Sequence, residues 1–144
     1  MDYGIVIEKI HQELKAYWGK GKVADYIPAL AEVEPKRYGI AIETLDGHSF
    51  QVGDADIRFS IQSISKVFAL AMVTRHLGDR IWKFVGREPS GNPFNSLVQL
   101  EYEHGIPRNP FINAGALVVT DRLMSLYEQP KDAILQFVRS ICGN

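Results

Sequence analysis

The chain has 144 residues, 46% of them hydrophobic, and this size and composition fit a single hydrophobic core rather than several. Its 16 basic and 17 acidic residues give a formal charge of -1 with no long run of one sign, which argues against a nucleic-acid or anionic-membrane partner. No apolar run reaches the roughly 20 residues of a membrane helix, and the charged N-terminus does not resemble a signal peptide.

The cysteine and histidine content predicts neither disulfides nor a metal site. Cys142 is the single cysteine, so no disulfide framework is expected and a reducing, cytoplasmic location is predicted. The histidines lack a paired spacing that would set two imidazoles on one metal ion. We therefore expect no metal, and a small neutral or zwitterionic ligand fits the balanced charge.

The first half of the chain predicts a helix followed by a β-hairpin. Residues 3–18 carry apolar side chains at spacings of three and four, which is typical of an amphipathic helix, and glycines follow it. Residues 38–53 alternate apolar and polar side chains on both sides of Asp46-Gly47. An Asp-Gly pair favours the positive φ angles of a two-residue hairpin turn.

The second half is predicted to be helical. Helical periodicity covers residues 63–77, and a short helix is predicted at 81–85, before the loop "GREPSGNPFNS". Two more helices are predicted at 115–127 and 131–142, the second starting at Pro130. This order indicates an α+β fold, in which a two-stranded sheet needs further strands or cover to be stable.

Ser63 and Lys66, within "FSIQSISKVFAL", form an S-x-x-K pattern. On a helix, three residues turn the side chain through ~300° and raise it by ~4.5 Å, so both would project from one face. A lysine amine can take the serine proton if desolvation lowers its pKa from ~10.4 toward 7, and the serine can then attack a carbonyl. If Ser63 opens the helix, its backbone N–H is also a donor for an oxyanion. The alternative is a helix-capping serine and a surface lysine.

Four segments in this order resemble the signature segments of the serine-dependent glutaminases: "GKVADYIPALAEV", "FSIQSISKVFAL", "GREPSGNPFNSLVQLE" and "GIPRNPFINAGALVVTD". These enzymes are L-glutamine amidohydrolases with a β-lactamase-like catalytic domain, and the resemblance spans about residues 20–122. It implies that Ser63 is the acylated nucleophile, that Lys66 activates it, and that neither a metal nor an organic cofactor is needed. It further implies L-glutamine as substrate, a homo-oligomer, and substrate binding by Ser63, Gln62, Asn113 and Tyr26.

Two of these residues also have purely structural interpretations. Asn113 precedes an apolar helix and can be its cap, although its amide can equally hold a carboxylate or amide of a substrate. Tyr26 can be a half-buried core aromatic rather than a residue at the mouth of the site. The loop "PSGNPFNS" is expected to scaffold the site and to take no part in the chemistry.

The chain also departs from the family, whose members are considerably longer. In the family the later half supplies further substrate-binding residues, proton-transfer tyrosines, a second oxyanion donor and more strands, and none of these has a counterpart here. We therefore expect residues 1–144 to be the N-terminal portion of one catalytic domain of the β-lactamase/penicillin-binding type. That incomplete α+β domain would hold an N-terminal helix, a hairpin and a helical segment, and would be inactive alone.

The predicted function is hydrolysis of L-glutamine to L-glutamate and ammonia through a serine acyl-enzyme. One alternative is another S-x-x-K acyl-serine hydrolase of the penicillin-recognising type. The other is a non-catalytic assembly module in which Ser63 caps a helix. The preference for glutamine over asparagine, the order of the oligomer and the regulation are not predicted.

Overall fold

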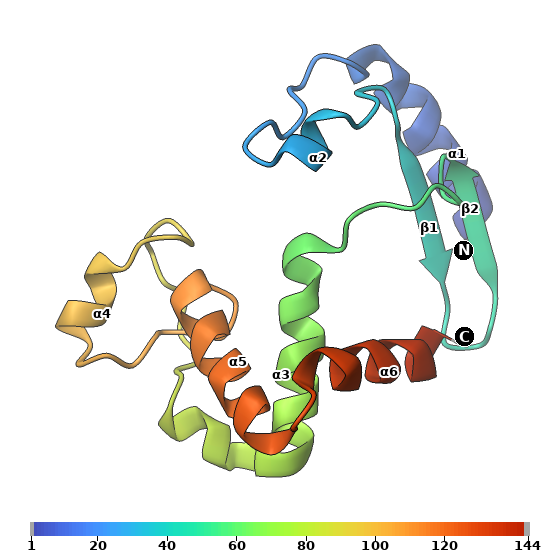
Figure 1. The fold of residues 1–144 in the computed structure, drawn as a ribbon. Helices are drawn as coiled ribbons and strands as arrows, with labels where there is room; N and C mark the ends of the chain where they lie inside the picture. Colours follow the sequence, from blue (N-terminus) through green and yellow to red (C-terminus); the bar gives the residue numbers. More distant parts are fainter. Residues whose placement is uncertain (1, 143–144) are drawn as a thin grey trace. The chain divides into compact units, whose positions relative to one another are not determined.

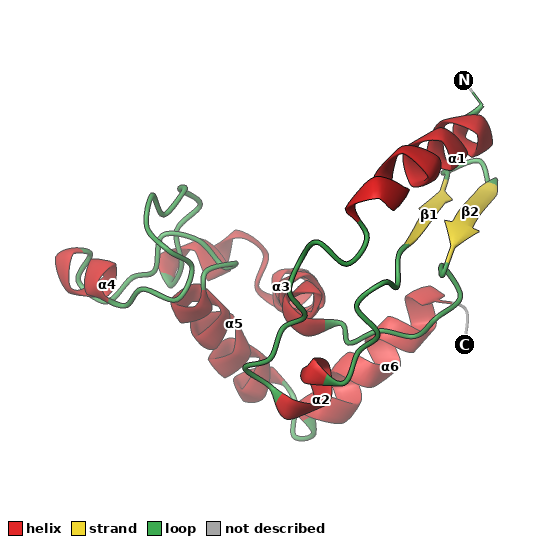
Figure 2. Cartoon of the chain, turned by 90° about the horizontal axis from the view of Figure 1, so that it is seen from above, coloured by secondary structure: helices red, strands yellow, loops and turns green. Residues whose placement is uncertain are grey.

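The computed structural model describes residues 2–142, which form two compact units. The first unit ends at Phe59 and the second begins at Ser60. Figure 1 follows the elements along the chain, and Figure 2 distinguishes helices from strands. The described residues contain a single two-stranded sheet and several helices, so the α+β prediction is confirmed.

The first unit packs one helix against the hairpin. Its elements are α1 (Tyr3–Leu14), the 3-10 helix η1 (Lys15–Tyr17), α2 (Pro28–Ala31), β1 (Gly39–Glu43) and β2 (Ser49–Gly53). The Asp2 carboxylate caps α1 by accepting a hydrogen bond from the backbone N–H of Ile5 (3.3 Å). The helix buries Ile7 and His11, and its first turn contacts the sheet through Tyr3 and Phe50, whose ring centroids lie 6.0 Å apart. Figure 2 shows α1 beside both strands.

The hairpin is confirmed, but its turn differs from the predicted two-residue form. The N–H of Thr44 donates to the carbonyl of His48 (2.9 Å), so the loop consists of the three residues from Leu45 to Gly47. Of these, Gly47 alone has a positive φ, at 84°. A two-residue turn of the Asp-Gly type needs a positive φ at both residues, whereas a three-residue loop needs it only at its last. The Thr44 hydroxyl favours the longer loop because it also bonds the Asp46 carboxylate.

The second unit is helical around one apolar core. Its elements are η2 (Gln62–Ile64), α3 (Ser65–Leu77), η3 (Gly78–Lys83), α4 (Val98–Tyr102), α5 (Asn113–Leu126) and α6 (Pro130–Cys142). Helix α3 packs against α5 and α6. The buried core consists of Ala69, Met72, Val73, Ile81, Val85, Val119 and Leu123. The predicted helices are therefore confirmed with shifted ends, and the helix predicted at 81–85 is the 3-10 turn η3.

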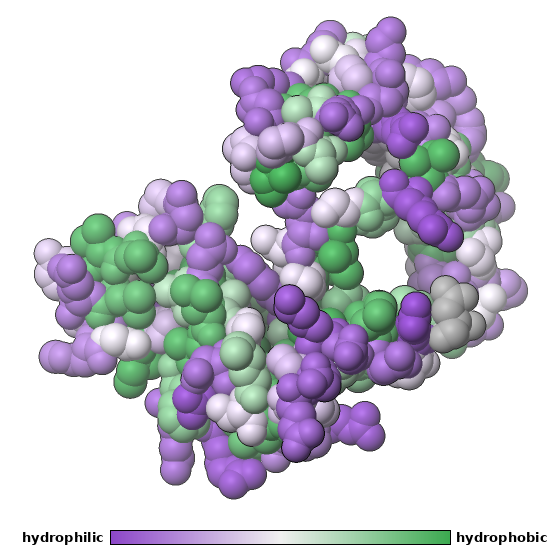
Figure 3. Space-filling view, viewed as in Figure 1, coloured by the Kyte–Doolittle hydropathy of each residue, from purple (hydrophilic) through white to green (hydrophobic). Residues whose placement is uncertain are grey.

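The segment around α4 exposes apolar side chains to solvent. Four large hydrophobic residues of this segment are more than half exposed: Phe94, Leu97, Val98 and Tyr102. Figure 3 shows hydrophobic residues at the surface in this region. Along residues 2–142, none of the helices combines the length and the apolar character needed to cross a bilayer.

Candidate functional site

Ser63 lies in the 3-10 turn η2 rather than on the regular helix. Helix α3 begins two residues later, at Ser65, and its N-cap is Ile64, which provides no side-chain cap. The Ser65 hydroxyl donates to the carbonyl of Gln62 (2.7 Å) and so closes the turn that carries Ser63. The capping interpretation of Ser63 is therefore wrong, and its side chain is exposed at the start of the helix.

Gln62 has an unusual backbone conformation for a residue with a side chain. Its φ is +46°, in the left-handed region that few non-glycine residues adopt. Such a conformation costs of order 1–3 kcal/mol, and it persists where the surrounding structure requires it, often at functional sites. The strained residue is the immediate neighbour of Ser63, so the chain direction at the serine is fixed by a specific turn.

Lys66 is held by two oxygens from the point where the loop before α5 enters that helix. Its Nζ donates to the backbone carbonyl of Phe111 (2.9 Å) and to Oδ1 of Asn113 (2.7 Å). The side chain is half-buried, so the surface-lysine interpretation is wrong. Among the described residues the Ser63 hydroxyl has no hydrogen-bond partner. The S-x-x-K spacing thus brings Ser63 and Lys66 close to the start of α3, but no hydrogen bond joins the two side chains.

Asn113 is the first residue of α5, and its side chain turns toward Lys66. The N-cap position belongs to Ile112, without a side-chain cap, so the capping interpretation of Asn113 is wrong. The backbone N–H of Asn113 donates to the carbonyl of Phe94 (2.9 Å). The loop "PSGNPFNS" thus contacts the site through its backbone, which agrees with the scaffolding role predicted for it.

Asn109 is a residue of this region that the sequence reasoning missed. Its Oδ1 accepts the N–H groups of Phe111 (2.9 Å) and Ile112 (3.1 Å), and its Nδ2 donates to the carbonyl of Glu88 (3.0 Å). The sequence signal was the pair Asn109-Pro110, which is typical of a turn. A turn signal does not reveal that the turn supports a lysine 43 to 45 positions earlier in the chain.

Tyr26 and Gln62 belong to different units of the structure. Tyr26 lies in the loop before α2 and is 74% exposed, so the interpretation of Tyr26 as a half-buried core residue is wrong. Of the predicted site residues, the second unit holds Gln62, Ser63, Lys66 and Asn113, and the first holds Tyr26.

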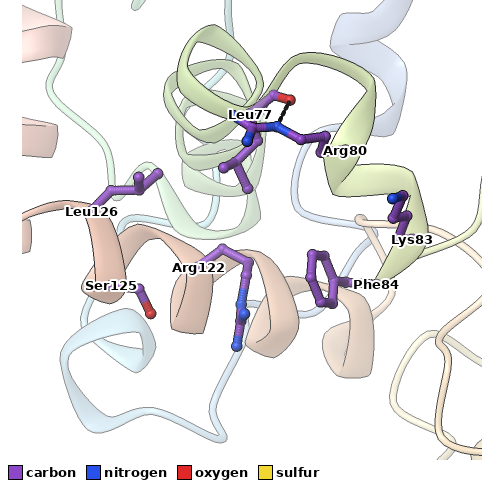
Figure 4. Close-up of a pocket in the computed structure, with 7 residues that line it drawn as sticks. All are labelled: Leu77, Arg80, Lys83, Phe84, Arg122, Ser125 and Leu126. Carbon is purple, nitrogen blue, oxygen red and sulfur yellow. Dashed lines mark hydrogen bonds between the residues drawn. The ribbon is translucent and has the colours of Figure 1, made fainter.

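Two pockets flank α3 in the second unit. One, of about 230 Å³, includes Lys66 among its lining residues, which are otherwise Ser65, Ala69, Ala116, Val119, Thr120 and Ile134. The other, of about 310 Å³, is shown in Figure 4 and is lined by Leu77, Arg80, Lys83, Phe84, Arg122, Ser125 and Leu126. This second pocket contains none of the predicted site residues. Within residues 2–142, no group of three or more His, Cys, Asp or Glu side chains is arranged to hold a metal ion.

Comparison with known proteins identifies the family. Residues 21–144 match the glutaminase family. A curated glutaminase of Salmonella arizonae is 58% identical over 139 residues, which are 96% of this chain and 45% of the relative. A solved probable glutaminase, ybaS, is 35% identical with a TM-score of 0.76, and covers 92% of this chain and 45% of its own. The solved structure of Mglu in its glutamate form is 36% identical with a TM-score of 0.75, over 94% of this chain and 32% of its own.

The relatives are similar to this chain both in sequence and in fold. The chain spans less than half the length of the relatives that it matches. The solved glutaminases that the chain resembles over most of its length have a β-lactamase-like fold. On the match over most of its length, this chain belongs to the glutaminase family.

Proposed function

We propose that the full-length protein carrying residues 1–144 hydrolyses L-glutamine to L-glutamate and ammonia through an acyl-enzyme on Ser63. The observation that carries the proposal is the fixed amine of Lys66, held by Phe111 and Asn113 at the start of the helix that follows the Ser63 turn. The glutaminase relatives support this reaction, and so does the solved glutamate form of the similar protein Mglu.

The hydrogen bonds of Lys66 leave room for one more partner. Besides its bond to carbon, the lysine nitrogen has three positions. The oxygens of Phe111 and Asn113 occupy two of them. In the proposed reaction that partner is the Ser63 hydroxyl, which can rotate toward the amine because it has no competing bond among the described residues.

The reaction proceeds by two acyl transfers. Ser63 Oγ forms a bond to the carbonyl carbon of the glutamine side-chain amide while its proton passes to Lys66. The C–N bond then breaks, the leaving nitrogen takes that proton, and ammonia departs from a γ-glutamyl ester. Water attacks the ester, gives its proton to the amine and releases glutamate, after which the proton returns to Ser63. No metal or organic cofactor takes part in these steps.

Substrate binding is proposed for Asn113, Gln62 and Tyr26 together with Ser63. The Asn113 amide has its oxygen on Lys66, and its Nδ2 has no partner within residues 2–142, so it is a donor for the carboxylate or amide oxygen of glutamine. The backbone of Gln62 and Ser63 lines the site, and the N–H of Ser63 contributes one donor to the oxyanion. For Tyr26 the proposal rests on the resemblance to the glutaminase family alone.

We further propose that residues 1–144 form only the N-terminal portion of one catalytic domain and are inactive alone. A two-stranded sheet is marginal without further strands, and exposed apolar residues around α4 favour association with another surface. A homo-oligomer is proposed for the full-length protein on the same grounds. Its cytoplasmic location is proposed from the lone cysteine, Cys142, which is typical of a reducing compartment.

The test is the stoichiometry of glutamine hydrolysis by the purified full-length protein. We expect ammonia and glutamate in equal amounts, and loss of both in Ser63→Ala. Ser60→Ala, which changes an exposed serine three residues earlier, is the matched control and should keep the wild-type rate. Hydrolysis of a penicillin instead of glutamine, or a Ser63→Ala variant with wild-type turnover, would contradict the proposal.

A further inference from the structure

The two oxygens that hold Lys66 come from one short stretch of chain, residues 111–113. One oxygen is the carbonyl of Phe111, in the loop before α5, and the other is on the side chain of Asn113, the first residue of that helix. The position of the Lys66 amine therefore depends on whatever holds this loop in place.

One peptide unit links Asn109 to Lys66. The carbonyl of Phe111 and the N–H of Ile112 belong to the same planar peptide, and in a trans peptide they point in opposite directions. The N–H of Ile112 donates to Oδ1 of Asn109 (3.1 Å), while the carbonyl of Phe111 accepts from Lys66 (2.9 Å). By holding the N–H side of the peptide, the Asn109 amide aims its carbonyl side at the lysine.

Asn109 is itself fixed by three further contacts. Its Nδ2 donates to the carbonyl of Glu88 (3.0 Å), and its Oδ1 accepts a second N–H, that of Phe111 (2.9 Å). Its backbone lies against Gly115 of α5 so closely that a Cβ there would overlap the Asn109 carbonyl group. The asparagine is thus anchored to a neighbouring loop and to a helix before it orients the peptide.

We propose that Asn109 is a positioning residue for the reaction, which acts through the Phe111–Ile112 peptide to hold the Lys66 amine. This inference rests on the proposed function of Lys66 as the proton acceptor. The inference extends that function, because it assigns the orientation of the amine to a side chain that has no hydrogen bond, within residues 2–142, to Lys66 or to the predicted substrate-binding residues.

The experiment compares three variants of the full-length protein in glutamine hydrolysis. Asn109→Ala removes the acceptor and should lower kcat at least about tenfold with little change in KM, because a misplaced base slows the chemical step. Asn109→Asp keeps the acceptor but replaces the donor to Glu88 with a carboxylate oxygen that faces the Glu88 carbonyl, so its kcat should lie between those of Asn109→Ala and wild type. Arg108→Ala is the matched control: its side chain contacts Glu103 and the neighbouring Pro89 carbonyl, and its loss should leave kcat unchanged.

A double mutant separates positioning from a general loss of structure. In a Lys66→Met background, Asn109→Ala should cause no further loss in the residual rate, because Asn109 would have no amine left to position. A full additional tenfold loss there, or Asn109→Ala with kcat within threefold of wild type, would overturn the inference. If Asn109→Ala does not fold, Asn109→Asp is compared in both backgrounds: a loss of rate that is equal with Lys66 and with Lys66→Met overturns the inference.

The controls distinguish this inference from the proposed function. Wild-type protein that releases no ammonia, or Lys66→Met with normal turnover, would refute the role of Lys66 itself. Normal wild-type activity, inactive Lys66→Met and fully active Asn109→Ala would refute only the role of Asn109.

Discussion

Replacement of Gly115 by alanine should disturb the site although Gly115 touches none of the predicted catalytic groups. Gly115 is the third residue of α5 and is buried against the Asn109 turn. A Cβ at this position would lie 2.8 Å from the carbonyl carbon of Asn109 and 3.0 Å from Cα of Pro110, and would overlap the Asn109 oxygen. All three neighbours are backbone atoms, so no side-chain rotation can relieve the overlap.

The size of the effect follows from these distances. Carbon atoms in good contact lie ~3.5–4.0 Å apart, and the overlap with the Asn109 oxygen is larger than that with its carbon, so the Asn109 turn has to move by roughly 1 Å or more. Overpacking of this kind costs ~1–3 kcal/mol, and the better helix propensity of alanine returns at most ~1 kcal/mol. Because the overlap is with backbone atoms, the cost lies at the upper end of this range, and we expect a net loss of about 2 kcal/mol in the free energy of unfolding. A shift near 1 Å at a catalytic group costs up to ~10²-fold in rate, so kcat should fall by about ten- to a hundredfold.

Urea unfolding and steady-state glutamine hydrolysis measure the two effects in the full-length protein. Gly21→Ala is the control, because a Cβ at Gly21 meets no atom within 4 Å. If Gly115→Ala instead gains stability, as helix propensity alone predicts, and keeps kcat within twofold, then the close approach of Asn109 to α5 does not support the site.

Three other substitutions test separate parts of the structure. Ser63→Ala should change the free energy of unfolding by less than ~0.5 kcal/mol, because Ser63 is exposed and caps no helix, while turnover falls at least ~10³-fold. Urea unfolding and ammonia release measure the two effects, and a loss of activity that is matched by unfolding of the protein would contradict this prediction. Lys66→Met should lower kcat at least ~10²-fold and Lys66→Arg should not restore it, since guanidinium stays protonated; a near-normal rate with arginine would show that only the positive charge matters. Gly53→Ala should destabilise the first unit by about 1–3 kcal/mol, because Gly53 has a φ of +68° and a Cβ would lie 2.7 Å from Nε2 of the buried His11. An unchanged urea midpoint would refute the close packing of Gly53 against His11.

Local patterns predicted the elements because their signals lie within a few residues of each other. The spacing of apolar side chains located α3, α5 and α6 but not the short helix α4, and Pro130 marks the first residue of α6 as predicted. The hairpin was predictable from alternation around Asp46-Gly47. Its exact loop was not, because the choice depends on hydrogen bonds of Thr44, a side chain whose partners the alternation does not specify.

The candidate site was predictable as a set of residues but not as an arrangement. The motif segments drew attention to Ser63, Lys66 and Asn113. The S-x-x-K spacing alone, however, suggests a hydrogen bond between the side chains of the lysine and the serine. In the structure Lys66 bonds a carbonyl 45 residues away and an amide 47 residues away, and only tertiary packing brings these together. The strained φ of Gln62 was also hidden, because nothing in a glutamine side chain favours the left-handed region.

The most direct test of Ser63 as a nucleophile activated by Lys66 is the site and rate of covalent modification by an electrophilic glutamine analogue. The full-length protein would be treated with the labelled analogue, digested, and the modified residue located by mass spectrometry at several times. We expect the label on Ser63, protection by excess glutamine, and modification at least ~10²-fold slower in Lys66→Met. Label on a different residue, or an equal rate of Ser63 labelling in Lys66→Met, would contradict the proposed roles of these two residues.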